Sequence, residues 1–194
     1  LLLTLAVISV SLGSTSSSAV NNFIGIVMAV FLAVVLMRIE SRAKQTLLPS
    51  GALRLRSRLA ALYGLMSLLV VMITSGEVFV PLFLQVLHQQ SPLAAGYLAA
   101  LIAAGWTLGS LVGSGLSGRG VDRALMIGPA LGWLGMIGLV LWVPAAGSGT
   151  WLQMVPICVA LAVIGIGVGL AWPHLLTRVL TSAPPEEQER AGAS

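Results

Sequence analysis

The chain has 194 residues, of which 57% are hydrophobic and only 8% are charged, and its formal net charge is +4. About a quarter of the residues of a soluble domain are charged, so these values exclude an ordinary soluble fold. The single cysteine, Cys158, excludes an internal disulfide and a cysteine-based metal site. Long uncharged stretches suit a bilayer, so the composition predicts an all-α membrane protein.

Six apolar segments follow one another along the chain. The first covers about residues 1–13 and is shorter than the roughly 17–25 residues that a spanning helix needs. The other five are long enough, and they lack the alternating polarity of barrel strands, so they predict helices. These five cover about residues 20–39, 59–87, 93–116, 124–143 and 151–172.

Basic residues gather in every second connection between these segments. Six of the ten Lys and Arg residues lie between Arg38 and Arg58, and the other four lie at positions 119, 123, 178 and 190. The positive-inside rule places such connections in the cytoplasm. We therefore expect a multi-pass protein of the cell (inner) membrane.

The same pattern predicts three regions. Residues 1–39 form a pair of membrane helices of which the first is truncated, and residues 40–58 form a basic cytoplasmic linker. Residues 59–194 supply four helices of an incomplete bundle. The chain starts without methionine, and we expect both of its ends to be truncations of a longer protein.

One face of segment 59–87 is polar. Such a stripe is expected where a membrane helix lines water or a substrate path. The alternative is packing against a neighbouring helix, with hydroxyl groups bonding across the contact. At about 100° per residue, the face collects Tyr63, Ser67, Thr74, Glu77, Pro81, Gln85 and His88.

Glu77 favours the cavity interpretation. A charge at mid-bilayer costs about 2.5–3.5 kcal/mol even on the lowest scale, so a buried glutamate there would bind a proton within reach of physiological pH. Pro81 cannot donate to the carbonyl of Glu77, which lies four residues before it, and we expect a kink there. The alternative is a glutamate near the outer interface that is paired or hydrated.

Glycine is patterned in two later segments, and Pro173 predicts a second kink. Gly105, Gly109 and Gly113 recur every four residues, which allows a neighbouring backbone to approach closely. Glycines on alternate residues of a helix face two of its sides, which suits bending or dense packing. These are Gly165, Gly167 and Gly169.

Several motifs resemble those of one family. The runs 81–85 (Pro-Leu-Phe-Leu-Gln) and 91–96 (Ser-Pro-Leu-Ala-Ala-Gly) resemble the helix–loop–helix signature of the fourteen-helix drug/proton antiporters of the EmrB/QacA type. This family lies within the major facilitator superfamily. The runs 40–43 and 47–49 resemble its linker, and the runs 165–173 and 189–194 resemble its twelfth helix and the loop after it.

The chain departs from the family at two points. Gln89 stands where the outer loop usually has glycine. The expected cytoplasmic loop with Arg119, Asp122 and Arg123 resembles the superfamily's Asp-Arg-x-Gly-Arg motif only loosely, and Gly118 occupies the position of its aspartate.

The resemblance implies part of a major-facilitator fold, roughly helices seven to twelve of fourteen. It also implies proton-driven export of hydrophobic or cationic small molecules from a lipid bilayer, with Glu77, Thr74, Ser67, Tyr63 and Gln85 as candidates for the cavity or for proton coupling. No catalytic, metal or cofactor motif is found, so we expect neither an enzyme nor a nucleic-acid partner. A periplasmic adaptor stays undecided. The alternatives are a transporter of a native lipid or metabolite, and a non-transporting membrane remnant.

Overall fold

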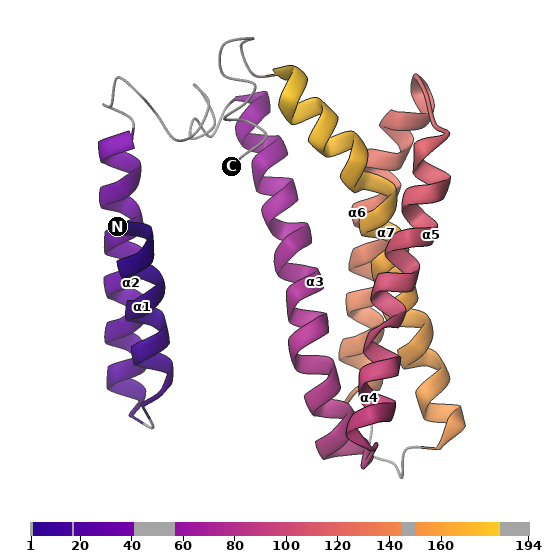
Figure 1. Cartoon of the computed structure of the whole chain (residues 1–194), viewed down its shortest axis with the longest axis horizontal. Coiled ribbons are helices and arrows are strands. Elements are labelled where there is room, and N and C mark those ends of the chain that lie inside the picture. Colours follow the sequence, from indigo (N-terminus) through magenta and orange to yellow (C-terminus); the bar gives the residue numbers. More distant parts are fainter. Residues whose placement is uncertain (1, 17, 41–56, 145–149, 183–194) are drawn as a thin grey trace. The chain divides into compact units, whose positions relative to one another are not determined.

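A computed structural model describes residues 2–16, 18–40, 57–144 and 150–182 (Figure 1). These residues form helices and no strand, which confirms the all-α prediction. The helices are α1 (Leu2–Ser14), α2 (Ala19–Glu40), α3 (Arg58–His88), α4 (Pro92–Ala99), α5 (Leu101–Ser114), α6 (Arg119–Trp142) and α7 (Trp151–Ser182). The predicted linker motifs at 41–49 and the run at 189–194 lie outside the described residues.

Five stretches of the described chain are long and apolar enough to cross a membrane. Helices α4 and α5 together make one of them, because the bonds from Ala100 N–H to Gly96 and from Ala104 N–H to Ala100, both 3.0 Å, continue through the bend at Ala100. Helix α1 is apolar but shorter than the others. The prediction of a multi-pass helical membrane protein is therefore confirmed.

The helices fall into two compact units, with the boundary after Ala60. In the first unit, α1 and α2 lie side by side as an antiparallel hairpin. A Cβ atom added to Gly25 would lie only 2.6 Å from the carbonyl oxygen of Ser9, so the two backbones approach closely. The second unit contains nearly all of α3 together with α4–α7.

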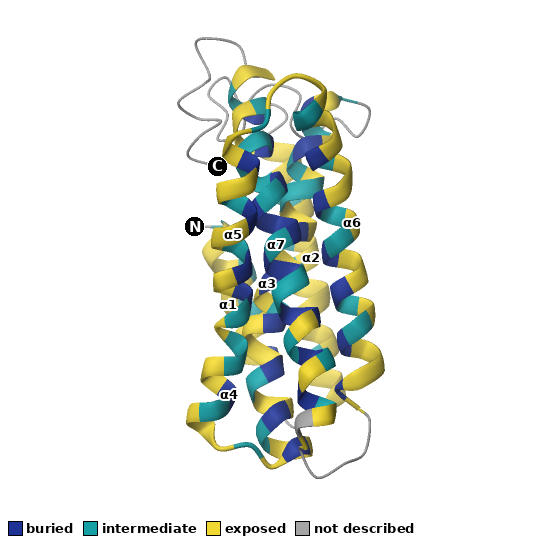
Figure 2. Cartoon of the chain, turned by 90° about the vertical axis from the view of Figure 1, so that its right-hand side faces the viewer, coloured by how far each residue is buried: buried dark blue, intermediate teal, exposed yellow. Residues whose placement is uncertain are grey.

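Helix α7 is the centre of the second unit. It packs against α5 and against α6, and Figure 2 shows buried residues along its length. Unlike a surface helix, it contributes apolar side chains that are fully enclosed by protein. These are Ile157, Leu161, Ile164, Val168 and Leu175.

Glycine permits the contact between α5 and α7. A methyl group on Gly105 or Gly109 of α5 would overlap the carbonyl groups of α7. A methyl group on Gly165 or Gly169 of α7 would overlap the carbonyl groups of α5. Gly113 is slightly less crowded, since its Cβ would lie 3.1 Å from the carbonyl oxygen of Leu170. The backbones of these two helices can meet only because both sides lack side chains.

A second glycine contact joins α7 to α6. Gly167 of α7 faces Gly128 of α6, and a Cβ on Gly135 would lie 2.7 Å from the carbonyl oxygen of Ala160. The alternate glycines of α7 therefore serve two neighbours, with Gly165 and Gly169 facing α5 and Gly167 facing α6.

Helix α7 continues to Ser182, beyond the predicted end near residue 172. Pro173 cannot donate to the carbonyl of Gly169, but the Ser110 hydroxyl of α5 donates to that oxygen at 3.3 Å. The neighbouring helix thus supplies a donor for the carbonyl that Pro173 leaves without a backbone partner.

Helix α6 begins at Arg119, whereas the sequence predicted a start near residue 124. Gly118 caps this helix with a φ of 51°, in the left-handed region that favours glycine. At the end of α3, Gln89 has a φ of 53°, so the position where the resembling family has glycine is left-handed here too. Both departures from the family pattern therefore lie at chain reversals.

We predict that Gly169→Ala lowers the stability of the protein by about 1–3 kcal/mol, because the added methyl group must push α5 away from α7. The measurement is thermal unfolding of the purified protein in detergent. Gly64→Ala is the matched control, since a Cβ at Gly64 in α3 meets nothing within 4 Å. Equal midpoints for the two variants would contradict the packing described here.

Candidate functional site

Helix α3 joins its neighbours mainly through side chains. Leu69, Ile73 and Leu84 are buried against the bundle. The Met72 side chain covers Gly132 of α6. The backbone of α3 does not approach α5 or α6 as closely as α7 does. This helix is therefore attached differently from the three helices that share glycine contacts.

The polar stripe of α3 lies beside its buried face. The helices α4–α7 leave most of the stripe uncovered, although the burial increases towards the end of the helix. Ser67, Thr74 and Glu77 are exposed, Tyr63, Pro81 and Gln85 are half-buried, and His88 is buried.

Glu77 lies inside the candidate membrane span formed by α3, about 16 Å along the helix axis from His88. The Glu77 side chain is exposed, so the described helices do not bury it. Pro81 lies within the helix and has no N–H for the Glu77 carbonyl. The Gln85 amide donates to the Pro81 carbonyl at 3.1 Å, so the polar groups of this turn are concentrated on one side.

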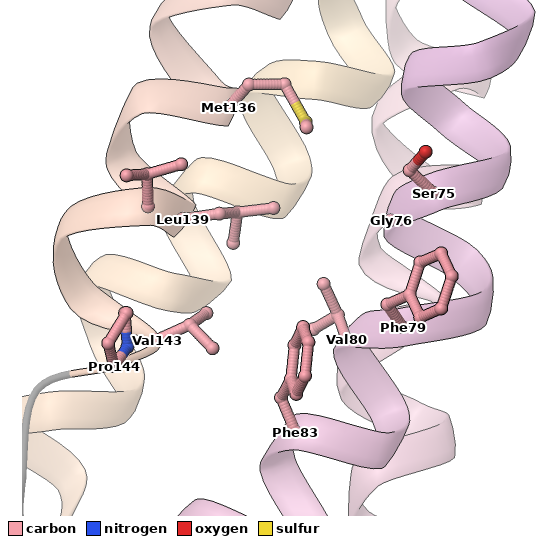
Figure 3. A pocket seen from close by; sticks show the side chains of 10 residues that line it. Ser75, Gly76, Phe79, Val80, Phe83, Met136, Leu139, Val143 and Pro144 are labelled. Carbon is pink, nitrogen blue, oxygen red and sulfur yellow. The ribbon is translucent and has the colours of Figure 1, made fainter. Parts of the chain in front are cut away.

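An apolar groove of about 470 Å³ lies between α3 and α6. Figure 3 shows Val80 and Phe83 of α3 opposite Leu139 of α6 and Val143, the residue directly after α6. Ser75 is the only side chain in its lining that carries a polar group. The groove is open along one side, and its lining suits a hydrocarbon or aromatic group. Sequence reasoning missed it, because it depends on how two helices lie relative to each other.

The groove and the polar stripe use different faces of α3. At about 100° per residue, Phe79 and Phe83 lie on the opposite side of the buried face from Glu77 and Thr74. The structure therefore does not bring Glu77 into the groove. The other stripe residues, Tyr63, Ser67 and Gln85, are also absent from its lining.

Each of the two histidines bonds to the end of a neighbouring helix. His88 of α3 bonds through Nε2 to the carbonyl of Val143 after α6, at 2.9 Å. His174 of α7 bonds through Nε2 to the carbonyl of Gly113 near the end of α5, at 3.0 Å. The last carbonyls of a helix have no partner within that helix, so His88 caps the end of α6. The Gly113 carbonyl also accepts from the Leu116 N–H at 2.9 Å, so His174 is a further donor at the end of α5. Within the described ranges, no group of three or more potential metal ligands is present.

The residues expected in a cytoplasmic loop lie in the first turns of α6. Asp122 forms an ion pair with Arg178 of α7, and both side chains are partly exposed. An exposed pair of this kind contributes at most about 1 kcal/mol. Arg119 and Arg123 are exposed beside it. The pair nonetheless links α6 to α7 at the end opposite His88.

Comparison with known proteins identifies the family. The family model of the Major Facilitator Superfamily matches residues 2–194. Two curated relatives are 35% identical over 126 residues, which is 61% of this chain and 25% of each relative. Both are named as probable multidrug-efflux transporters of Mycobacterium tuberculosis, from strains CDC 1551 / Oshkosh and ATCC 25618 / H37Rv.

No solved structure matches the chain significantly. The matched region spans about a quarter of the length of the two relatives. The family match, in contrast, covers nearly the whole of this chain. The candidate membrane spans and the helical fold of the chain agree with membership of that family. The chain therefore belongs to the major facilitator superfamily of membrane transporters.

Proposed function

We propose that the intact protein is a secondary transporter that exports hydrophobic compounds in exchange for protons across the inner membrane. The family and the names of the two relatives support efflux as the activity. Proton exchange rests on one observation, the position of Glu77 on the polar stripe of α3. The motifs at 81–85 and 91–96 support the fourteen-helix drug/proton antiporter family as the subtype.

Glu77 suits proton coupling because of where it lies. The other acids of the chain are at positions 40, 122, 186, 187 and 189. Of these, the structure describes Glu40 and Asp122, and both lie at helix ends. A carboxylate at mid-bilayer costs about 2.5–3.5 kcal/mol, and binding a proton removes that charge. A site that faces a cavity in one state and is enclosed in another would therefore take up and release a proton during each cycle.

The substrate class follows from apolar surfaces. The groove between α3 and α6 offers hydrocarbon and aromatic contacts, which favour hydrophobic compounds over hydrophilic ones. The same lining favours the acyl chain of a native lipid, so lipid transport is the second candidate. A non-transporting remnant is the third, and the Glu77 experiment below also tests it.

The proposed orientation places the basic stretch at 38–58 in the cytoplasm and the connection at 88–92 outside, following the positive-inside rule. We predict that Ser91→Cys reacts with a membrane-impermeant thiol reagent on intact cells and that Ser50→Cys reacts only after the cells are opened. Both variants carry Cys158→Ser. The reverse labelling pattern would overturn the orientation.

We predict that Glu77→Gln removes the pH dependence of export and lowers the export rate well below that of the wild type, because the variant cannot use the proton gradient. Glutamine keeps the shape of glutamate but cannot titrate. Substrate binding should largely survive. Glu77→Asp should retain some activity with an altered pH profile. The measurement is export rate against pH at matched expression.

The control is Ser67→Ala, which changes another exposed residue of the same stripe without removing a titratable group. It should keep the pH profile of the wild type. If Glu77→Gln also kept that profile, and lost only abundance in the membrane, Glu77 would have a structural role and the proton-exchange proposal would fail.

A further inference from the structure

His88 is a buried polar side chain with only one bonded nitrogen. It is 1% exposed, and its Nε2 lies 2.9 Å from the carbonyl oxygen of Val143. A carbonyl can only accept, so Nε2 carries a hydrogen, and in the neutral ring Nδ1 is a bare acceptor. Among the described residues, Nδ1 has no hydrogen-bond partner.

The bond lies where the groove ends. Val143 and Pro144 belong to the groove lining, and Val143 is the C-terminal cap of α6, whose N–H donates to the Leu139 carbonyl at 2.9 Å. Pro144 has no N–H of its own. Elsewhere α3 meets α6 through apolar side chains such as Met72 over Gly132. His88 therefore joins two helices beside a space that is not filled by protein.

The bond between His88 and Val143 is called the joint between α3 and α6. A second proton on the His88 ring would change the hydrogen-bond partners that this joint requires. Protonated Nδ1 becomes a donor on a cationic ring, and a buried charged donor without an acceptor is strongly disfavoured. The carbonyl end of α6 attracts a cation, but that attraction is weaker than the loss from an unsatisfied buried charge. The protonated ring is therefore stable only where water or another acceptor reaches Nδ1.

No nearby carboxylate supplies that acceptor among the described residues. Glu77 lies about 16 Å away along α3, and Asp122, with Arg119 and Arg123, lies roughly 30 Å away along α6. The titratable groups on the other packed helices are Tyr97 of α4, which is exposed, and Cys158, His174 and Arg178 of α7. Arg178 and His174 bond to Asp122 and Gly113 at the other end of the bundle.

We infer that His88 is a proton-binding site whose occupation opens the joint between α3 and α6. The proton comes from water and binds Nδ1, and the charged ring is stable only when the helix ends separate and admit water. Closing the joint returns the proton to water and restores the neutral ring that donates to Val143. The inference is independent of Glu77, because it concerns a different residue and requires no substrate.

The test measures the distance between nitroxide labels at Val86 and Leu141 by pulsed electron spin resonance. Both residues are exposed, at 59% and 66%, and both lie near this end of the bundle. The intact protein carries Cys158→Ser and is reconstituted in lipid vesicles with equal pH on both sides and no substrate. We expect one short distance at pH 8 and a second, longer population at pH 5, a range that spans histidine titration.

Three variants identify the residue responsible. His88→Gln provides a neutral donor and should remove the pH dependence, whereas His88→Ala should give the longer distance at both pH values. His174→Gln is the matched control, because it changes the other histidine at a helix end and should behave as the wild type does. Wild-type distances that do not change with pH, or a pH shift that survives in His88→Gln, would overturn the inference. The shift should persist in Glu77→Gln, so this test separates the two proposals.

Discussion

The close approach of backbones at the glycines of α7 is the constraint on which the rest of the bundle depends. Lipid tails are as apolar as leucine, so helices in a bilayer gain little from hiding apolar side chains from one another. Short-range packing must hold them together. Gly165 and Gly169 bring α7 against α5, while Gly167 brings it against α6. Three helices thereby become one closely packed block around α7.

That block changes the effect of a proline inside it. Pro173 would be expected to weaken α7, but the close approach of α5 places the Ser110 hydroxyl within reach of the freed Gly169 carbonyl. The glycine contacts and this bond support each other, since Ser110 could not reach α7 if larger residues separated the helices. Helix α7 continues past Pro173 and carries Arg178 to the ion pair with Asp122.

Helix α3 has the opposite character. It meets the block through side chains, leaves an apolar groove beside α6, and carries Glu77 and the polar stripe. In transporters of this kind, parts of the protein rock against each other around a central site. A closely packed block beside a less closely packed helix is a suitable arrangement for such motion. The proposed proton exchange lies on α3, beside the closely packed helices α5–α7.

Sequence reasoning predicted the helical segments and the glycine faces, because both depend on properties of a single helix. Apolar length identified the spans, and the alternate glycines at 165, 167 and 169 indicated two packing surfaces. It could not predict the groove, the bond from His88 to Val143 or the ion pair from Arg178 to Asp122. Each of these depends on how two helices lie relative to each other, and residues 55 or 56 positions apart give no local signal.

The surroundings of Glu77 could not be predicted for a related reason. A helix pattern identifies a polar face but does not say which neighbour covers it, and α4–α7 leave Glu77 exposed. The start of α6 was also shifted, because the cap at Gly118 decides where this helix begins.

The central proposal is that Glu77 exchanges a proton for substrate. The most direct test measures whether the protein releases protons when substrate binds. A hydrophobic cation would be added to the purified intact transporter in weakly buffered detergent solution while the pH is recorded. The wild type is expected to release protons as substrate binds, and Glu77→Gln is expected to bind the same compound without releasing them. Equal proton release from both proteins would contradict the proposal.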